Sequence, residues 1–260
     1  MTPHRRPRYR PLVAVAGLLL AAGLTIGPAA AGGLGIGSAP GLSLAWLDCR
    51  DPVGAGAANF APGCGSDIQE WPLFPSFSLA AQADSVFSME LVIDVIVAND
   101  SLPPWWLMAP GCRANAWAAD GTPSTSCLDA WNGLGTGSFQ GWLPGTPGGA
   151  RNHARLLVAA GTLPDDAVTL LANTAYTACR VLLRTVNSST CGEGCETPAC
   201  LVFNSLLIRR HHTPADEEFV VTGGENGGSD RVTWKGGLGA DCQAVPVRRT
   251  TWGAVKALYR

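Results

Sequence analysis

Charge is scarce in this chain. Asp, Glu, Lys and Arg make up 15% of its 260 residues, whereas Gly and Pro contribute 32 and 19 residues. A composition of this kind favours many turns and argues against long solvent-facing helices. After the first ten residues no cluster of Lys and Arg stands out, and without such a cluster the chain is not expected to bind nucleic acid.

Motifs of the common catalytic families are also missing. There is no G-x-S-x-G nucleophile elbow, and GLGTGS at 133–138 lacks the strand-to-helix context of a phosphate loop. No cysteines have the spacing of the CxxC pairs in a zinc knuckle. We therefore predict no catalytic residue and no cofactor.

Long apolar runs are confined to the N-terminus, where residues 1–31 have the pattern of a secretory signal peptide. Four arginines in the first ten residues precede an uncharged stretch from Pro11 to Ile26, and Ala29–Ala31 offer small residues for cleavage. The stretch has about 16 residues, fewer than the roughly 20 of a membrane-spanning helix. The arginines lack the usual twin-arginine pattern, so we predict Sec-type export and cleavage near Ala31.

Cleavage would leave a chain that works outside the cytoplasm, either secreted, periplasmic or at the cell surface. The predicted signal holds four of the 18 Lys and Arg and none of the 20 Asp and Glu, so the remainder has a net charge of about −6. No second apolar segment is long enough to be an integral membrane segment. We predict a flexible leader over 32–41 and a single domain over 42–260.

The clearest structural element is a strand over Val86–Ala98. Alternate residues form an apolar face and the intervening residues are mixed, which is the period-two pattern of a sheet that covers a core. The apolar face consists of Phe87, Met89, Leu91, Ile93, Val95 and Val97. We predict that Phe87, Leu91, Ile93 and Val95 lie in the core, on a central strand.

Seven further segments have strand patterns and are separated by Gly, Pro and Asn clusters. They are 42–47, 76–81, 155–160, 175–185, 201–210, 217–222 and 231–234. Eight short strands without helix–strand alternation predict an all-β fold, an antiparallel β-sandwich of immunoglobulin-like or jelly-roll-like type. Residues 99–150 are expected to be mostly loop, and 251–260 to be a short C-terminal helix.

The segment LLANTAYTACRVLL contains Leu170, Thr174 and Tyr176, and it resembles the L-x-x-x-T-x-Y segment of fibronectin type III-like sandwiches. This resemblance implies a tyrosine corner, in which the Tyr176 hydroxyl bonds back to the backbone. The long alternating strand is similar to those of cohesin-like sandwiches. The ending TWGAVKALYR resembles that of uncharacterised secreted bacterial proteins, and it implies no activity.

All nine cysteines follow the predicted signal, and an oxidising compartment favours disulfides among them. Cys49 and Cys64 are 15 residues apart, as are Cys112 and Cys127, and closing such a loop stabilises a fold by about 3 kcal/mol. We predict these two bridges. Two further bridges are predicted among Cys191, Cys195, Cys200 and Cys242. Cys179 shares strand parity with apolar neighbours and is predicted to be a buried free thiol.

The most suggestive surface candidate is Pro103-Pro104-Trp105-Trp106. Prolines favour an extended backbone, in which adjacent side chains point to opposite faces. One indole is therefore expected to face the core and the other to face outward, where an indole can bind a sugar or anchor a protein. The alternative is that Trp105 and Trp106 both close one end of the sandwich.

Two metal sites have to be weighed against structural explanations. Asp94, Asn99 and Asp100 carry oxygens of the kind that bind Ca²⁺, although a strand end running into an Asx turn explains the same residues. The cysteines of 191–200 with His211-His212 could bind zinc, in competition with disulfide formation. We predict no metal at either place.

Two hypotheses about function follow. The first is a secreted, non-catalytic β-sandwich protein, either an envelope or matrix component or a binding module for an extracellular glycan or protein. The second is a secreted glycan-active hydrolase that uses loop carboxylates such as Asp165-Asp166 or Glu217-Glu218. Acid–base work on glycans needs two carboxyl groups about 5–10 Å apart across a cleft. Converging carboxylates would favour the hydrolase, and a flat face or aromatic platform the binding module.

Overall fold

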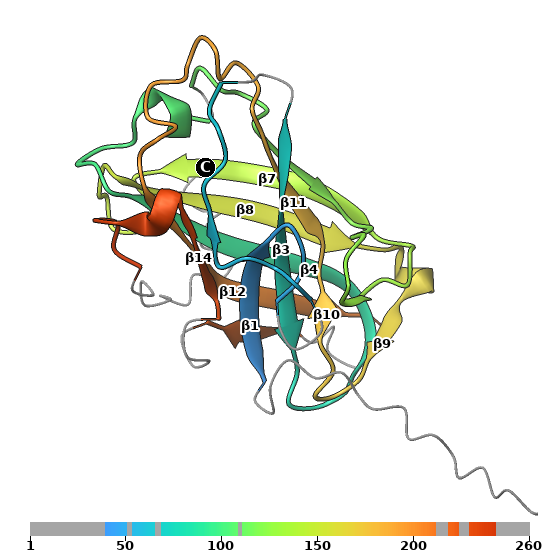
Figure 1. Ribbon diagram of the computed structural model, residues 1–260. Coiled ribbons are helices and arrows are strands. Elements are labelled where there is room, and N and C mark those ends of the chain that lie inside the picture. The colour runs from blue at the N-terminus through green and yellow to red at the C-terminus, as the bar shows by residue number, and fades with distance from the viewer. Residues whose placement is uncertain are drawn as a thin grey trace, which may run out of the picture. The chain divides into compact units, whose positions relative to one another are not determined.

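The part of the chain that the structure describes is built mainly of β-strands, as a computed structural model shows (Figure 1). The described residues are 40–50, 54–65, 69–108, 111–211, 218–223 and 229–242. Within them the helical elements are the 3-10 turns η1 Pro104–Trp106, η2 Pro164–Asp166 and η3 Lys235–Gly237. The predicted signal peptide, nearly all of the predicted leader and the predicted C-terminal helix lie outside these residues.

Sheet A has the strand order β5-β11-β3-β10-β6, with β1 also paired to β3. Its strands are β1 Gly41–Trp46, β3 Glu70–Ser78, β5 Trp117–Asp120, β6 Leu128–Asp129, β10 Tyr176–Thr177 and β11 Arg180–Arg184. Its pairings are antiparallel except for the two-residue contact between β10 and β6.

Sheet B has the order β2-β14-β12-β4-β8-β7, with β13 paired to β12 and β9 paired to β4. Its strands are β2 Asn59–Phe60, β4 Ala83–Val97, β7 Thr136–Pro144, β8 His153–Gly161, β9 Val168–Leu170, β12 Ala199–Arg210, β13 Glu218–Thr222 and β14 Arg231–Trp234. The short pairing of β14 with β2 is parallel, and the other pairings are antiparallel. The predicted antiparallel β-sandwich is therefore confirmed.

The apolar face predicted for the long central strand packs in the core between the sheets. Five of its six residues are at most 1% exposed, namely Met89, Leu91, Ile93, Val95 and Val97. Figure 1 shows β1, β3 and β11 of sheet A crossing in front of β4, β7 and β8 of sheet B. Alternation along β4 thus points one face of sheet B at sheet A.

Phe87 is the exception, and its predicted place in the core is wrong. Arg209 pairs with Ser88 but Arg210 pairs with Val86, so Phe87 is the extra residue of a β-bulge. A bulge changes the alternation of side chains along a strand. Val86 consequently fills the core, while Phe87 is only partly buried and packs edge-on against His211, with ring centroids 5.7 Å apart.

The segment predicted as one strand over 175–185 is divided into β10 and β11. Just before β10, the N–H of Leu171 donates a hydrogen bond to the Tyr176 hydroxyl oxygen at 3.0 Å. This is the bond from the tyrosine back to the backbone that the resemblance to fibronectin type III-like sandwiches implied. It holds the chain where it passes from β9 of sheet B to β10 of sheet A.

The two local disulfides predicted from spacing are wrong. Each of the four cysteines involved bonds to a more distant one, and the pairs are Cys49–Cys127, Cys64–Cys195, Cys112–Cys191 and Cys200–Cys242. Their sequence separations are 78, 131, 79 and 42 residues. Bridges that close longer loops remove more entropy from the unfolded chain, so these pairs constrain it more than the local pairs would.

Of the four cysteines expected to pair among themselves, Cys200 and Cys242 do so, whereas Cys191 and Cys195 bond to earlier parts of the chain. Cys179 is free and buried. Burial, with a smaller contribution from the negative charge of Asp120, raises the pKa of the Cys179 thiol far above its usual range. Such a thiol stays protonated and packs as a small apolar side chain.

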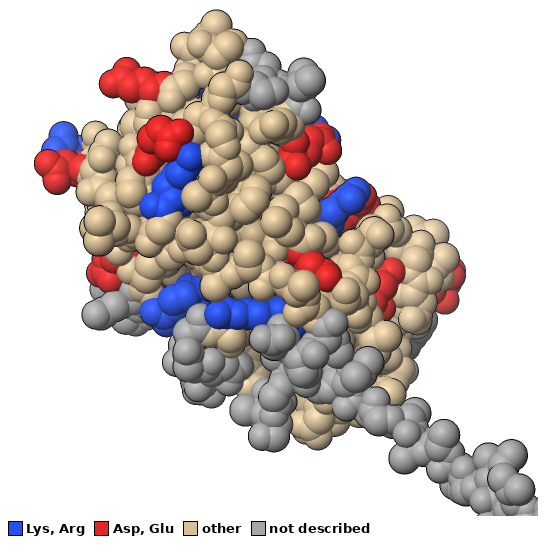
Figure 2. All heavy atoms as spheres, in the orientation of Figure 1, with Lys and Arg blue, Asp and Glu red and all other residues tan. Residues whose placement is uncertain are grey.

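Among the described residues, no helix is long and apolar enough to cross a membrane. Most of the surface on the face shown in Figure 2 is neutral, with charged side chains in small groups of either sign.

Candidate ligand-binding groove

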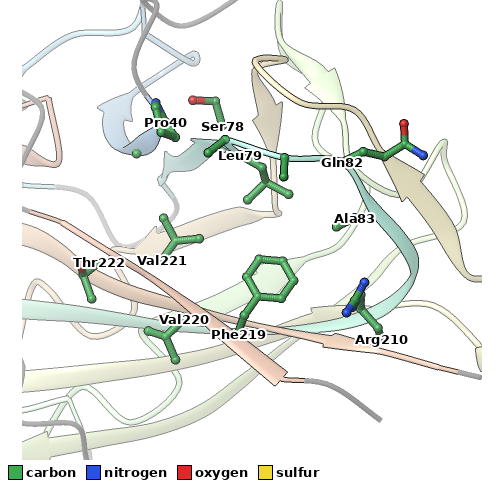
Figure 3. Close-up of a pocket in the computed structure, with 13 residues that line it drawn as sticks. Pro40, Ser78, Leu79, Gln82, Ala83, Arg210, Phe219, Val220, Val221 and Thr222 are labelled. Carbon is green, nitrogen blue, oxygen red and sulfur yellow. The ribbon is translucent and has the colours of Figure 1, made fainter. Parts of the chain in front are cut away.

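A groove of about 530 Å³ opens at one end of the sandwich, and we call it the β13 groove (Figure 3). The turn between β3 and β4, together with the start of β1, forms one wall, and β13 forms the other. Its lining is mostly apolar or small and includes Leu79, Ala80, Ala81, Ala83, Phe219 and Val221.

Small side chains in the β3–β4 turn leave this space open. Leu79 and Ala83 are buried at its base, while Ala80 and Ala81 are exposed. The Asn173 N–H donates to the Leu79 carbonyl at 2.8 Å and so ties the turn to the neighbouring loop. Because alanine ends at its Cβ atom, the wall does not reach across to β13.

The groove lies between the β3–β4 turn and the face of β13 that carries Phe219 and Val221. Successive side chains of a strand point to opposite faces of the sheet. Phe219 and Val221 point toward Leu79, whereas Val220 points the other way (Figure 3). The side chains of Phe219 and Val221 therefore line the β13 side of the groove.

The backbone groups along that edge can be assigned from the ladder with β12. The Gly223 N–H donates to the Asn204 carbonyl at 2.9 Å, and the register continues through Val221↔Leu206 and Phe219↔Ile208. Backbone groups of alternate residues face the same neighbour in an antiparallel pair. The N–H and C=O groups of Val220 therefore point away from β12, at the other edge of β13.

Among the described residues that line the groove, Arg210 carries the only charged side chain, and it lies at the opposite end from Pro40 (Figure 3). The preceding residue, Arg209, points to the outer face of sheet B, where it forms ion pairs with Glu90 at 2.8 Å and Glu218 at 2.9 Å. The described lining of the groove is thus mainly apolar, with one arginine at one end.

A second, shallower hollow of about 290 Å³ lies on the outer face of sheet B, and we call it the hydroxyl hollow. Phe87, turned outward by the bulge, is its aromatic side chain. The hydroxyl-bearing residues around it are Ser88, Thr136, Ser138 and Thr162. Bulges commonly re-aim a side chain at a binding site. A ring beside several hydroxyl groups, with no charged residue in the lining, is suited to a neutral polar ligand.

The proposed surface tryptophans are both buried, which corrects the prediction that one faces outward. Trp105 and Trp106 have no exposed surface, because Pro104–Trp106 form a 3-10 turn and not an extended segment. Trp105 stacks on Trp234 with ring centroids 5.1 Å apart, and Trp106 meets Trp105 edge-on at 4.9 Å. Neither indole is accessible as a ligand anchor, and the alternative that both close one end of the sandwich is confirmed.

A buried arginine holds this tryptophan cluster in place. The Arg113 guanidinium lies 3.8 Å from the centre of the Trp105 ring and has no exposed surface. It donates hydrogen bonds to the carbonyls of Trp105 at 2.9 Å and Val186 at 3.1 Å, and to that of Arg184. Hydrogen bonds and a cation–π contact offset the cost of burying the charge.

The structure does not bring the predicted calcium ligands together. Asp94 is buried in mid-strand, where Arg155 donates to its two oxygens at 2.7 and 2.9 Å and Asn204 also donates to it. Asn99 and Asp100 are exposed beyond the end of β4, and five residues of strand span about 16 Å. The Asp94 carboxylate is occupied by a buried ion pair instead.

Of the carboxylates considered for hydrolysis, Asp165, Asp166 and Glu218 are described, and these three do not face one another across a groove. Asp165 and Asp166 are exposed neighbours on η2, and Glu218 is paired with Arg209. Glu217 and His212 lie outside the described residues, and the cysteines of the zinc alternative are in disulfides. Among the described residues no three His, Cys, Asp or Glu side chains are placed to hold a metal ion.

The lowered pKa of Asp48, a half-buried acid, has a structural cause. Burial tends to raise the pKa of Asp48, but hydrogen bonds outweigh this effect and lower its pKa to about 2. The donors are the Ser126 hydroxyl at 2.6 Å, the Thr125 hydroxyl, the Ser126 N–H at 2.9 Å and the Cys49 N–H at 2.8 Å. Asp48 thereby joins the two loops that the Cys49–Cys127 bridge also links.

Sequence reasoning did not identify the groove. It predicted a strand over 217–222, but it could not show that this strand lies beside the turn between β3 and β4. The sequence signal that could have indicated an edge strand is a short apolar segment between polar and Gly-rich flanks. HHTPAD precedes the segment and GGENGG follows it. Turn-forming and polar flanks of this kind are common around strands at the edge of a sheet.

Comparisons with known proteins add one structural likeness. No protein-family model matches the chain, and no curated protein matches it. The chain is similar to the second type II cohesin module from the cellulosomal adaptor ScaA scaffoldin of Acetivibrio cellulolyticus, at 7% identity and a TM-score of 0.31. The match covers 70% of this chain and 90% of that module. The β-sandwich assignment rests on the strand pairing within this chain.

Proposed function

We propose that this chain is a secreted, non-catalytic β-sandwich module that binds a protein ligand at the β13 groove. The observation that carries the proposal is a mainly apolar groove between the β3–β4 turn and β13, a strand that pairs with β12. An edge strand beside apolar side chains offers both main-chain hydrogen bonds and pockets for a partner. The four disulfides are consistent with an extracellular protein, and Sec-type export by way of residues 1–31 is part of the proposal.

A non-catalytic role fits the arrangement of the acidic residues. Glycan hydrolysis needs two carboxyl groups on opposite sides of the scissile bond. Among the residues that the structure describes, no acidic residue lines the β13 groove or the hydroxyl hollow. A protein ligand therefore suits the groove better than hydrolysis does.

A carbohydrate ligand at the hydroxyl hollow is the second candidate. Phe87 offers an aromatic ring, and Ser88 and Ser138 lie among the hydroxyl groups around it. Sugars bind by stacking on rings and by exchanging hydrogen bonds with such groups. The hollow is smaller, about 290 Å³ against about 530 Å³ for the groove, which is why we place it second.

The test is to screen the purified protein in parallel against a phage-displayed random peptide library and a glycan array. Ala81→Trp fills the groove from an exposed position, and Ala114→Trp is the matched control at an exposed alanine outside it. We expect enriched peptides whose affinity falls at least tenfold with Ala81→Trp and is unchanged with Ala114→Trp. Glycan binding that Phe87→Ala abolishes, without any groove-dependent peptide, would replace this proposal with the carbohydrate one.

A further inference from the structure

We infer that residues 32–39, the part of the predicted leader that precedes the described chain, lie in the β13 groove as an extension of β1 and occupy it until a ligand displaces them. The displacement rests on the proposed function and deepens it, because it names a regulator of the same site. That regulator is a segment of this chain.

The described chain begins at one end of the groove. Pro40 is its first residue and lines the groove, as does Gly41, the first residue of β1. Figure 3 shows Pro40 at one end of the lining and Arg210 at the other. Residues 32–39 are therefore attached to the protein at the groove itself. Attachment gives the segment a high effective concentration there, so it can dock where a separate peptide of the same sequence would bind poorly.

The direction of β1 leads the preceding residues along the wall of the groove. β1 is antiparallel to β3, and Gly41 pairs with Ser78, the last residue of β3. A continuation of β1 before Gly41 therefore passes the end of β3 and runs beside Leu79 and Ala80, in the wall opposite β13. Eight extended residues span about 26 Å, against about 17 Å for the five residues of β13. The segment is long enough to pass the whole of β13.

The alternation of side chains in β1 continues into this segment. Leu42 and Leu44 point into the core and are at most 1% exposed. Leu34 and Ile36 have the same parity, and they are the two large apolar residues among 32–39. Side chains of equal parity share one face of an extended chain. A continued β1 would thus turn Leu34 and Ile36 toward β13, where Phe219 already points toward the β3–β4 turn (Figure 3).

The rest of the segment suits a groove with an apolar lining. Glycine occupies the intervening positions 33, 35 and 37, and the segment carries no charge. The opposite face of the docked chain would then present backbone, with no further side chain to bury. Burial of two large aliphatic side chains favours docking, whereas the ordering of several glycines opposes it. This balance makes the segment displaceable by a ligand that fills the groove better.

NMR of the exported, methyl-labelled protein tests the placement. Its intact mass first establishes where the chain begins, and a start after Ile36 would overturn the inference. We expect nuclear Overhauser effects from the Leu34 and Ile36 methyl groups to the Phe219 ring and the Val221 methyl groups. Ala81→Trp, which fills the groove, should abolish them. Their absence from the unsubstituted protein would overturn the inference.

Two matched double variants test the displacement. Leu34→Ser with Ile36→Ser removes the apolar side chains, whereas Gly35→Ser with Gly37→Ser changes the opposite face of the same segment. Melting temperatures establish that both variants fold. We expect the first variant to bind the best groove-dependent library peptide at least fivefold more tightly than the unsubstituted protein does, and the second to differ less than twofold. Equal affinities for all three proteins would overturn the displacement.

The remaining outcomes separate this inference from the proposed function. Groove-dependent peptide binding without any contact from Leu34 or Ile36 would overturn the inference and leave the proposed function standing. Contacts in the groove, with no library peptide bound by either double variant, would overturn the proposed function and the displacement with it. Contacts between differently labelled chains in a mixed sample, with a concentration-dependent dimer in sedimentation, would overturn the intramolecular docking and assign the groove to a second copy.

Discussion

The two ends of the sandwich differ in the size of the side chains that fill them. One end is filled by Trp46, Trp71, Trp105, Trp106 and Trp234, which pack ring against ring and have at most 6% of their surface exposed. Cys64–Cys195 lies there, since the Trp234 indole donates to the Cys195 carbonyl. At the other end alanines line the β13 groove, and no disulfide joins residues that line it.

This contrast separates stability from binding. Large aromatic side chains bury the most apolar area, and long-range disulfides limit the unfolded chain, so the tryptophan end is expected to supply most of the resistance to unfolding. The groove end has small side chains, and no strand of the described chain pairs with the far edge of β13, so this end is expected to contribute less. Substitutions at the tryptophan end should therefore lower the unfolding free energy, and substitutions at the groove end should lower the affinity for a ligand.

The largest effect is expected from Trp105→Ala. It removes an indole that stacks on Trp234 and leaves Arg113 without its aromatic neighbour. Removal of a buried tryptophan costs about 3–5 kcal/mol of unfolding free energy. Denaturant unfolding monitored by circular dichroism measures the loss. A cost below about 1 kcal/mol, less than is usual for any buried large-to-small change, would show that the cluster is not the stabilising end.

Leu91→Ala, in the middle of β4, provides the reference for the core between the two ends. Leu91 is 1% exposed, and the substitution is expected to cost about 2–5 kcal/mol. The same denaturant titration measures it. Phe87→Ala serves as its control, since the bulge turns Phe87 out of the core and its loss should cost clearly less.

Replacing both Cys64 and Cys195 by serine removes their disulfide. This change is expected to lower the free energy of unfolding by about 2–4 kcal/mol. Peptide mapping without reduction should first recover Cys64 joined to Cys195 and Cys49 joined to Cys127. Recovery of Cys49 joined to Cys64 would contradict the pairing on which the contrast between the two ends depends.

A smaller, pH-dependent effect is expected from Asp48. Its pKa is lowered from 3.8 to about 2 in the folded chain, so the unfolded chain binds the proton more tightly. The stabilisation is present above pH 3.8 and is lost as the pH falls toward 2. Asp48→Asn should reduce the acid sensitivity of the melting temperature over this range, because it removes the titrating carboxyl group. A variant as acid-sensitive as the unsubstituted protein would contradict the role of Asp48.

The smallest effect on stability is expected at the groove. Ala81→Trp adds a side chain at an exposed position and should change the unfolding free energy by less than about 0.5 kcal/mol. The melting temperature should stay within about 2 °C of that of the unsubstituted protein. A large destabilisation would mean that this end is packed and not open.

Much of the sheet was predictable because alternation is a local property. The patterns over 86–98, 201–210 and 231–234 correspond closely to β4, β12 and β14. The first half of β3 was missed because Pro72 and Pro75 argue against a central strand, and β7 was missed because its glycines are typical of a loop.

The site was less predictable because it depends on contacts between distant segments. Whether Phe87 faces in or out is decided by a bulge, and which cysteines pair is decided by where their loops pack. The prolines before Trp105 favoured an extended segment, yet proline is equally suited to the first position of a 3-10 turn. Burial of both indoles followed from that turn.

The most direct test of binding at the β13 groove is NMR chemical-shift mapping with and without a groove-dependent peptide. We predict that the side-chain signals of Phe219 and Val221, which line the groove, shift on binding. The signals of Thr136 and Ser138, in the hydroxyl hollow, should change much less. Shifts confined to the residues around Phe87, or no shift at Phe219 and Val221 with peptide bound, would contradict the account.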